Sequence, residues 1–228
     1  MAFRDLVDGI AEVNDEISVE HGMFDHSSAT SHAPVLFNSI TEAPGQRSAL
    51  NVLARDRLCS LFEVTPGELI DILAWAMANP SEPEIIDAHS AQVLENTQAS
   101  VDLNALPIPW HYREDRGRYQ SASIIIAEYD GVRNMSYHRQ FLRDTNHCVA
   151  RFVPRHLRTI TDKARANGDE VNIAVVNGAD ATVLLAAAMS FTYDLDELKV
   201  AAALHERLHG SPLKLVTLSN GIQVPADA

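Results

Sequence analysis

The chain has 228 residues, enough for one large domain or two small ones, and 46% of them are hydrophobic, so a sizeable core can form. Its formal net charge of −13 argues against a nucleic-acid-binding protein, which would present a basic surface. Cys59 and Cys148 lie far apart and outside any CxxC spacing, so neither a disulfide scaffold nor a cysteine zinc site is expected, and a reducing cytoplasm fits best.

The beginning of the chain is predicted to be mainly helical. Its first residues are charged, so no signal peptide is expected, and no apolar run in the sequence is long enough to span a bilayer. Residues 21–33 are small and polar and predict a loop, residues 35–37 a short strand, and residues 48–62 a helix. An opening amphipathic helix is predicted from apolar residues at helical spacing: Phe3, Leu6, Val7, Ile10, Val13 and Ile17.

The next helix has a clear start signal. Thr65 can cap it, a proline follows in the first turn, and Glu68 can complete a capping box. We expect this helix to end near Asn79, because proline disfavours helix at the residue before it. Trp75 and Met77 lie on its apolar positions and are predicted to be core residues.

The proline-rich segment 106–109 separates this helical part from a strand-rich part, which predicts domains at 1–105 and 106–228. The second part is predicted to hold strands at 123–129, 132–141, 148–152, 171–176, 213–218 and 222–224, with Asp130-Gly131 as a hairpin turn and helices at 154–168, 180–188 and 194–209. The pattern predicts an α+β fold with antiparallel strands and helices packed beside them.

Asn134, His156 and Glu197 form one candidate metal site. Their oxygen and nitrogen donors suit Mn²⁺ or Mg²⁺ better than structural zinc, although the same residue types are common in turns and caps.

Arg139, on a predicted strand, could bind a carboxylate or phosphate through two parallel hydrogen bonds, or could simply be solvated. The turn 176–180 precedes a helix and could attract an anion, but turns of this kind are usually only connections.

Two histidine groups offer alternatives. Residues 205–209 read HERLH, which matches the HExxH pattern of zinc hydrolases, with Glu206 as the base. The motif directly precedes Gly210, so it can equally be the charged last turn of a helix. His21, His26 and His32 fit no standard metal spacing, and a solvated loop is favoured for them.

From residue 106 onward the chain resembles the UbiD family of decarboxylases, which use prenylated FMN; before residue 60 the resemblance is weak. The matching segments are Leu106-Pro107-Ile108-Pro109 with Gly117-Arg118-Tyr119, the strand 133–139, the helix start 153–158, residues 187–190, residues 197–204 and the stretch 216–226. The resemblance implies a small helix-rich N-terminal α/β part, followed by a split β-barrel flavin-binding domain with flanking helices.

The resemblance also assigns roles to residues. Asn134, His156 and Glu197 would bind the Mn²⁺ or Mg²⁺ that anchors the flavin phosphate, with a potassium ion often nearby. Arg139 would lie beside the isoalloxazine and bind the substrate carboxylate. The remaining cofactor contacts would be Ser136, Tyr137, His138, Arg155 and Met189, although Arg155 stands where a neutral residue is expected.

The family continues past the V-P-A segment into a C-terminal domain that carries two glutamates, which this sequence does not contain. We therefore expect one subunit of a hetero-oligomeric, UbiD-like carboxy-lyase, acting on an unsaturated or aromatic acid and inactive until a second polypeptide supplies those carboxylates. The alternatives are a non-catalytic flavin-binding or regulatory homologue, and a zinc hydrolase at His205 and His209.

Overall fold

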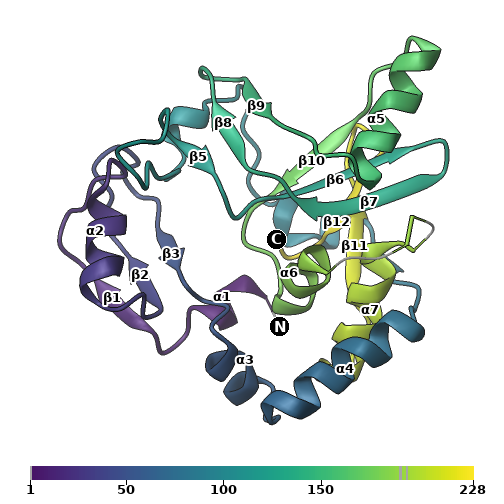
Figure 1. The fold of residues 1–228 in the computed structure, drawn as a ribbon, viewed down its shortest axis with the longest axis horizontal. Coiled ribbons are helices and arrows are strands. Elements are labelled where there is room, and N and C mark those ends of the chain that lie inside the picture. Colours follow the sequence, from purple (N-terminus) through teal and green to yellow (C-terminus); the bar gives the residue numbers. More distant parts are fainter. Residues whose placement is uncertain (1, 190–191, 194) are drawn as a thin grey trace.

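The computed structural model describes residues 2–189, 192–193 and 195–228 (Figure 1). The helices are α1 (Phe3–Leu6), α2 (Gly22–Ala29), α3 (Arg55–Leu61), α4 (Pro66–Ala78), α5 (His156–Asn167), α6 (Ala181–Ala188) and α7 (Glu197–His209), with short 3-10 turns at Ala88–Ser90, Gln92–Leu94 and Leu103–Ala105. The strands are β1 (Ala11–Val13), β2 (Val35–Phe37), β3 (Ser48–Leu50), β4 (Glu84–Ile85), β5 (Tyr119–Gln120), β6 (Ile124–Tyr129), β7 (Val132–Tyr137), β8 (Gln140–Leu142), β9 (Cys148–Ala150), β10 (Ile173–Val176), β11 (Lys214–Thr217) and β12 (Gln223–Pro225).

These strands form four three-stranded sheets, in the orders β1-β2-β3, β10-β6-β7, β12-β11-β4 and β5-β8-β9. The predicted α+β class is confirmed. Within the described ranges no strand pairing joins the sheets into a closed barrel, so the split β-barrel stays a prediction. None of the helices in these ranges is both long and apolar enough to cross a bilayer.

The predicted opening helix is wrong beyond its first turn. α1 ends at Leu6, and Gly9 adopts a positive φ of 67° that a helix cannot continue through. The chain then extends into β1, which pairs in parallel with β2. Strand pairing therefore outweighs the helical spacing of Val13, which packs against the small core under β2.

The segment 21–33 is not a loop, because α2 occupies most of it. Met23 and Ser27, one helical turn apart, are both buried, which gives this short helix an inner face. Ser27 Oγ accepts a hydrogen bond from Asn51 Nδ2 at 3.0 Å. Tertiary contacts therefore stabilise α2 as a helix, and the sequence shows no apolar periodicity from which this helix could be predicted.

The prediction of one helix over residues 48–62 is only partly correct. The first residues form β3, which pairs antiparallel with β2, and α3 begins only at Arg55. Between them Asn51 adopts φ 60°, a left-handed conformation that asparagine tolerates and that ends the strand.

α4 has the predicted start and end. The Thr65 side chain accepts from Glu68 N, and the Glu68 carboxylate accepts from Thr65 N at 2.7 Å, which completes the capping box. The prediction that Trp75 and Met77 are core residues is wrong, since they are 42% and 38% exposed. The buried face of α4 instead carries Leu69 and Ala76, because the helix is apolar on more sides than one face can bury.

Removing the cap of α4 should have a measurable cost. We expect Thr65→Ala to lower the free energy of unfolding by about 1 kcal/mol, which corresponds to roughly 2–4 °C in Tm for a chain of this size. Thermal unfolding followed by circular dichroism measures this shift. Thr159→Ala, in the body of α5, removes a similar hydroxyl without a capping role, and an equal loss there would refute the assignment to the cap.

The central sheet β10-β6-β7 has two different faces. Its hairpin turns at Asp130-Gly131, as predicted, and both residues have positive φ values of 55° and 72°. Ile124 and Ile126 belong to the large core shared with α6 and α7, whereas Ile125 packs with Leu157 of α5 on the other face. Figure 1 shows α5 and α6 on opposite sides of these strands.

The predicted strand 132–141 is two strands in two sheets. β7 pairs with β6, and β8 pairs with β5 and β9, so the chain crosses between sheets at residues 138–139. Arg139 therefore lies in a connection rather than on a strand. The other strands and helices of this half are confirmed to within a few residues, although the expected start of α7 at Asp194 lies outside the described residues.

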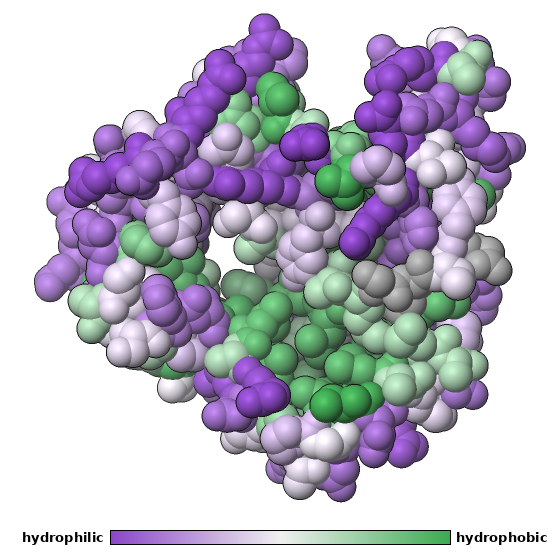
Figure 2. Space-filling model, in the orientation of Figure 1, coloured by the Kyte–Doolittle hydropathy of each residue, from purple (hydrophilic) through white to green (hydrophobic). Residues whose placement is uncertain are grey.

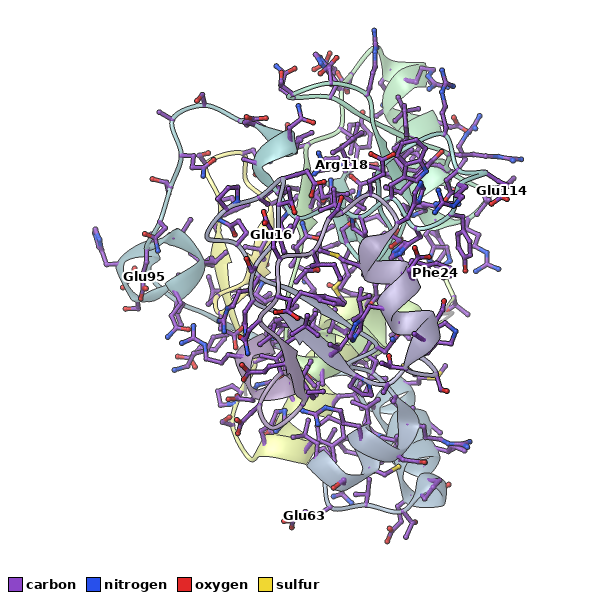
Figure 3. The ribbon with its side chains drawn as sticks, turned by 90° about the vertical axis from the view of Figure 1, so that its left-hand side faces the viewer. Glu16, Phe24, Glu63, Glu95, Glu114 and Arg118 are labelled. Carbon is purple, nitrogen blue, oxygen red and sulfur yellow. The ribbon has the colours of Figure 1, made fainter. Side chains whose placement is uncertain are left out.

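The proline-rich segment 106–109 is held from both sides. Arg118 donates to Ile108 O at 2.8 Å and to Leu106 O at 2.6 Å. The next residue, Trp110, exchanges backbone hydrogen bonds with the N-terminal part, through Val19 O and His21 N. Figure 3 views this side, with Arg118 and Phe24 labelled. The boundary at 105/106 stays a prediction.

Candidate functional site

Three of the predicted site residues converge where the starts of α5 and α7 meet β7. The buried carboxylate of Glu197 accepts a hydrogen bond from Asn134 Nδ2 at 2.7 Å through Oε1. The same oxygen lies 3.7 Å from His156 Nδ1. Glu197 Oε2 accepts from Met135 N at 3.0 Å, which is possible because β7 is an edge strand with free outward N–H groups. The sequence spreads these residues over 64 positions, and the fold brings them together.

The neighbouring side chains of β7 continue this network along one face of the strand. Ser136 Oγ donates to Asn134 Oδ1 at 2.9 Å and lies 3.0 Å from His138 Nε2. Asn134, Ser136 and His138 are spaced by two, so they share a face, as a strand requires. Burial lowers the pKa of His138, which keeps the imidazole neutral.

A second pair of contacts fixes the start of α7. Arg133 forms an ion pair with Asp196 at 2.6 Å and donates to Gln223 Oε1 at 2.6 Å. Asp196 also caps α7 by accepting from Leu198 N at 2.9 Å. Successive residues of β7 therefore hold successive residues at the start of α7, so the Glu197 carboxylate has a defined position.

The electrostatics at Glu197 fit a cation. The side chain is 4% exposed, and burial raises the pKa of its carboxyl above the ordinary value. Its nearest partners are a neutral amide, a backbone N–H and an imidazole beyond hydrogen-bonding distance. An oxygen-rich set with one imidazole is the kind of site that Mn²⁺ or Mg²⁺ occupies, and a bound ion would offset the burial of the carboxylate.

Arg139 lies apart from this cluster, in the connection between β7 and β8. Its guanidinium is 51% exposed, forms an ion pair with Asp115 at 2.6 Å, and stacks over the ring of Tyr119 at 3.9 Å. Arg139 therefore has an acidic partner within this chain, although Asp115 is not one of the two glutamates that the family resemblance places in a C-terminal domain. Sequence inspection missed Asp115, because it lies 24 residues earlier in a polar loop with no motif around it.

The other predicted cofactor contacts are more scattered. Tyr137 points to the opposite face of β7, where its hydroxyl donates to Leu184 O at 3.2 Å and burial raises its pKa to about 12. Arg155 is exposed at the N-cap of α5, and Met189 follows α6, where its N–H donates to Ala186 O. The neighbouring Ser190, part of a segment that resembles the family, lies outside the described residues.

A cavity of about 1100 Å³ opens on the Tyr137 side of β7. It lies between the N-terminal part and the segments around β5 and α6, and its lining includes Phe24, His111, Tyr137, Asn177 and Leu184. Figure 2 shows this face hollowed near its centre, with hydrophobic residues gathered below the hollow. The turn 176–180 thus borders a cavity through Asn177, as well as connecting β10 to α6.

The three N-terminal histidines do not gather into a metal site among the described residues. Their rings pack on aromatic side chains instead: His21 on Trp110 and His26 on Phe37, with ring centroids 5.0 and 5.4 Å apart. The HERLH segment forms the end of α7, directly before Gly210, as expected. His205 and His209 lie beside Asp180, a residue that the sequence marks only as the start of a helix.

The comparison with known proteins gives a consistent picture. The family described as UbiD, 3-octaprenyl-4-hydroxybenzoate carboxy-lyase Rift-related domain, matches residues 84–228, more than half of the chain. An anhydromevalonate phosphate decarboxylase of Methanosarcina mazei is 32% identical over 99% of this chain and 52% of its own length. One from Aeropyrum pernix is 37% identical over 76% of this chain and 41% of its own length.

Solved structures of other proteins have the same fold as this chain. The UbiD-class enzyme HmfF from Pelotomaculum thermopropionicum, in an evolved dimeric form in complex with prFMN, superposes with a TM-score of 0.92 and 27% identity, covering all of this chain and 55% of HmfF. A vanillic acid decarboxylase of Sedimentibacter hydroxybenzoicus shares the fold, with a TM-score of 0.89 and 18% identity over 99% of this chain and 52% of its own. The chain thus spans about half the length of the relatives it matches. Because the family model matches residues 84–228, more than half of the chain, the chain belongs to the UbiD family.

Proposed function

We propose that this chain is the metal- and prenylated-FMN-binding part of a UbiD-like decarboxylase that acts on an unsaturated or aromatic carboxylic acid. The proposal rests mainly on one observation: the side chains of Asn134 and His156 lie next to the buried carboxylate of Glu197. The similarity to HmfF, solved with prFMN and with FMN, supports the choice of cofactor. The names of the curated relatives support the choice of reaction.

In this proposal, Asn134, His156 and Glu197 hold a Mn²⁺ or Mg²⁺ ion that anchors the flavin phosphate, with a potassium ion nearby. Ser136 and His138 orient Asn134 through their hydrogen bonds, as outer residues do at metal sites. Arg155 lies at the start of α5, where a guanidinium and helix N–H groups both favour a phosphate. When bound, prenylated FMN serves as the electron sink that stabilises the charge left by departing CO₂.

Arg139 is the residue that we propose receives the substrate carboxylate. Its half-exposed guanidinium can fork onto a carboxylate, and the Tyr119 ring beneath it restricts its orientation. Asp115 already pairs with it, so substrate binding would exchange one carboxylate for another. The proton that replaces CO₂ must come from an acid within reach of the substrate. We propose that a second subunit brings that acid, as part of the half of the relatives' length that this chain does not span.

Reconstitution tests this function. The chain should be expressed with a prenylated-FMN supply and Mn²⁺, alone and together with a candidate second subunit. We expect a flavin absorbance spectrum, about one Mn²⁺ per chain, and CO₂ release from unsaturated acids only in the pair. A flavin-bound pair that releases no CO₂ from any acid would favour the non-catalytic alternative. A colourless, metal-free protein that never pairs would contradict the proposal.

Arg139→Lys should separate binding from positioning in the assembled enzyme. Lysine keeps the charge but loses the planar fork, so we expect kcat/KM to fall at least ~10-fold, mainly through KM. The control is Arg143→Lys, because Arg143 is 68% exposed and makes only a 4.0 Å contact with Asp144. Steady-state kinetics with the two variants measures the difference. Unchanged kinetics in Arg139→Lys would remove Arg139 from substrate binding.

A further inference from the structure

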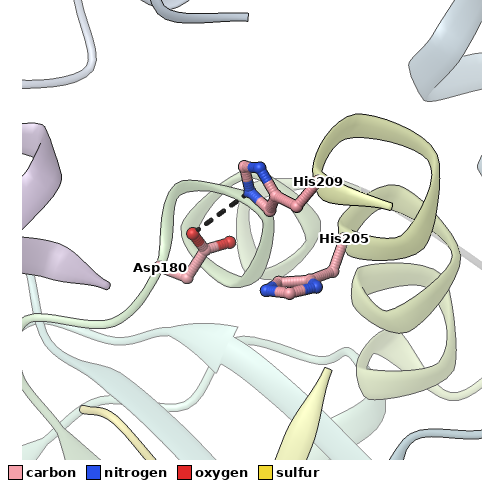
Figure 4. Close-up of side chains that lie close together, drawn as sticks. All are labelled: Asp180, His205 and His209. Atoms are coloured by element: carbon pink, nitrogen blue, oxygen red, sulfur yellow. Dashed lines mark ion pairs between the residues drawn. The ribbon is translucent and has the colours of Figure 1, made fainter. Parts of the chain in front are cut away.

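Asp180, His205 and His209 gather at the junction of α6 and α7 (Figure 4). One possible ligand atom from each residue lies within 4.8 Å of those of the other two. Asp180 is fully buried and caps α6, and the two histidines occupy the last turns of α7. The cluster lies roughly 12 Å along the helix axis from Glu197, so it is separate from the site proposed above.

Two potential ligand atoms of this cluster face each other as an ion pair and have no hydrogen bond to any described residue. Asp180 Oδ1 accepts from the backbone N–H and the hydroxyl of Thr182, which leaves Oδ2 for the cluster. Asp180 Oδ2 and His209 Nε2 are both buried without a hydrogen bond, and they lie 3.4 Å apart. The His209 side chain is only 9% exposed. Buried polar atoms without partners are costly, and a ligand between them would satisfy both.

His205 has the orientation that metal-binding histidines adopt. Its Nδ1 lies 2.8 Å from Ser211 O, and a carbonyl only accepts, so Nδ1 carries the proton. Nε2 then holds a lone pair. Such a hydrogen bond from the far nitrogen to a carbonyl is the usual way in which a ligating imidazole is fixed. The rings of His205 and His209 are 4.6 Å apart and inclined at 75°, so they do not stack.

We propose that Asp180, His205 and His209 bind a Zn²⁺-type transition-metal ion that ties the start of α6 to the end of α7. Two imidazoles and one carboxylate suit Zn²⁺, Co²⁺ or Fe²⁺, whereas the oxygen-rich set at Glu197 suits Mn²⁺ or Mg²⁺. The site is structural rather than hydrolytic. Glu206, which would be the base of a HExxH hydrolase, is exposed on another side of α7.

Metal titration of the full chain tests this inference. The Glu197→Gln background removes the carboxylate of the other site, so any remaining transition-metal binding reports on the cluster. We expect one Co²⁺ per chain, with visible d–d absorption that Zn²⁺ displaces. At a Zn²⁺ concentration 100-fold above the Kd, Tm should rise by roughly 5–11 °C.

His209→Gln and Asp180→Asn should each lose this absorption and the Tm shift, while His89→Gln, at an exposed histidine, should keep both. A Zn²⁺ stoichiometry that His209→Gln leaves unchanged would overturn the site. The Glu197→Gln chain without a cluster substitution keeps the test decisive if a variant fails to fold. If the folded Glu197→Gln chain shows no Co²⁺ absorption and takes up no Zn²⁺, the cluster is only a buried Asp–His ion pair and the proposal is overturned.

Discussion

Replacing Glu197 by glutamine should abolish tight Mn²⁺ binding and flavin retention, and should make the metal-free protein more stable at neutral pH. The loss of binding follows from removing the only charged oxygen donor among the three residues at the proposed site. We expect affinity to fall by more than the ~10–100-fold typical of losing an outer hydrogen-bonding residue. Isothermal titration with Mn²⁺ and the flavin absorbance of purified protein measure both effects.

The gain in stability follows from the pKa of Glu197, which burial raises above its ordinary value of 4.5. Between 4.5 and the folded-state pKa, the folded protein binds more protons than the unfolded chain. The contribution of Glu197 to the free energy of unfolding therefore falls as pH rises through that window, and it stays unfavourable above it. Glutamine carries no charge and removes this dependence.

Urea unfolding at a series of pH values, without metal, should show this slope in the parental protein and a flatter one in Glu197→Gln. Glu206→Gln is the matched control, since Glu206 lies on the same helix but is exposed. Equal slopes in the parental protein and Glu197→Gln would show that burial of this carboxylate carries no penalty. Glu197→Gln is thus expected to weaken Mn²⁺ binding and to raise the stability of the metal-free protein. Opposite effects of this kind are typical of functional sites, where activity is maintained at the expense of stability.

Replacing Arg133 by alanine should strongly destabilise the fold. Arg133 and Asp196 are 11% and 17% exposed, so alanine leaves a mostly buried carboxylate without its cation. Breaking such a pair costs about 3 kcal/mol, which corresponds to roughly 6–12 °C in Tm for a chain of this size. Thermal unfolding of the metal-free protein measures this loss. Because the start of α7 also positions Glu197, Mn²⁺ affinity should fall as well.

Two further variants make this result specific. Arg158→Ala breaks an exposed pair with Asp162 and should change the free energy of unfolding by no more than about 0.5 kcal/mol. The double variant Arg133→Met with Asp196→Asn removes both charges and keeps a capping side chain, so it should recover most of the lost stability. If the double variant is as unstable as Arg133→Ala, packing rather than charge accounts for the loss.

Local chemistry made much of the fold predictable. The capping box at Thr65, the Asp130-Gly131 turn and the Gly168 helix end act through neighbouring residues, and all three occur where expected. The errors at residues 7–33 have a different origin. There, pairing between β1 and β2 and burial of Met23 decide the structure, and neither depends on local sequence.

In the candidate site, too, some features could be predicted from the sequence and others depend on long-range contacts. Residue types and family resemblance selected Asn134, His156 and Glu197 correctly as neighbours, although spacing alone could not bring them together. The partners of Asp115 and Asp180 could not be predicted, because a single acidic residue carries no signal until the fold places it beside Arg139 or His209. Long-range partners of this kind need the tertiary structure.

The segment between the proline-rich stretch and β5 has a mechanical consequence. Trp110 exchanges backbone hydrogen bonds with Val19 and His21 of the N-terminal part, and the Arg118 carbonyl accepts from Leu142 N of β8 at 3.0 Å, so backbone hydrogen bonds tie this segment to the N-terminal part and to β8. Movement of one part against the other would break these bonds together.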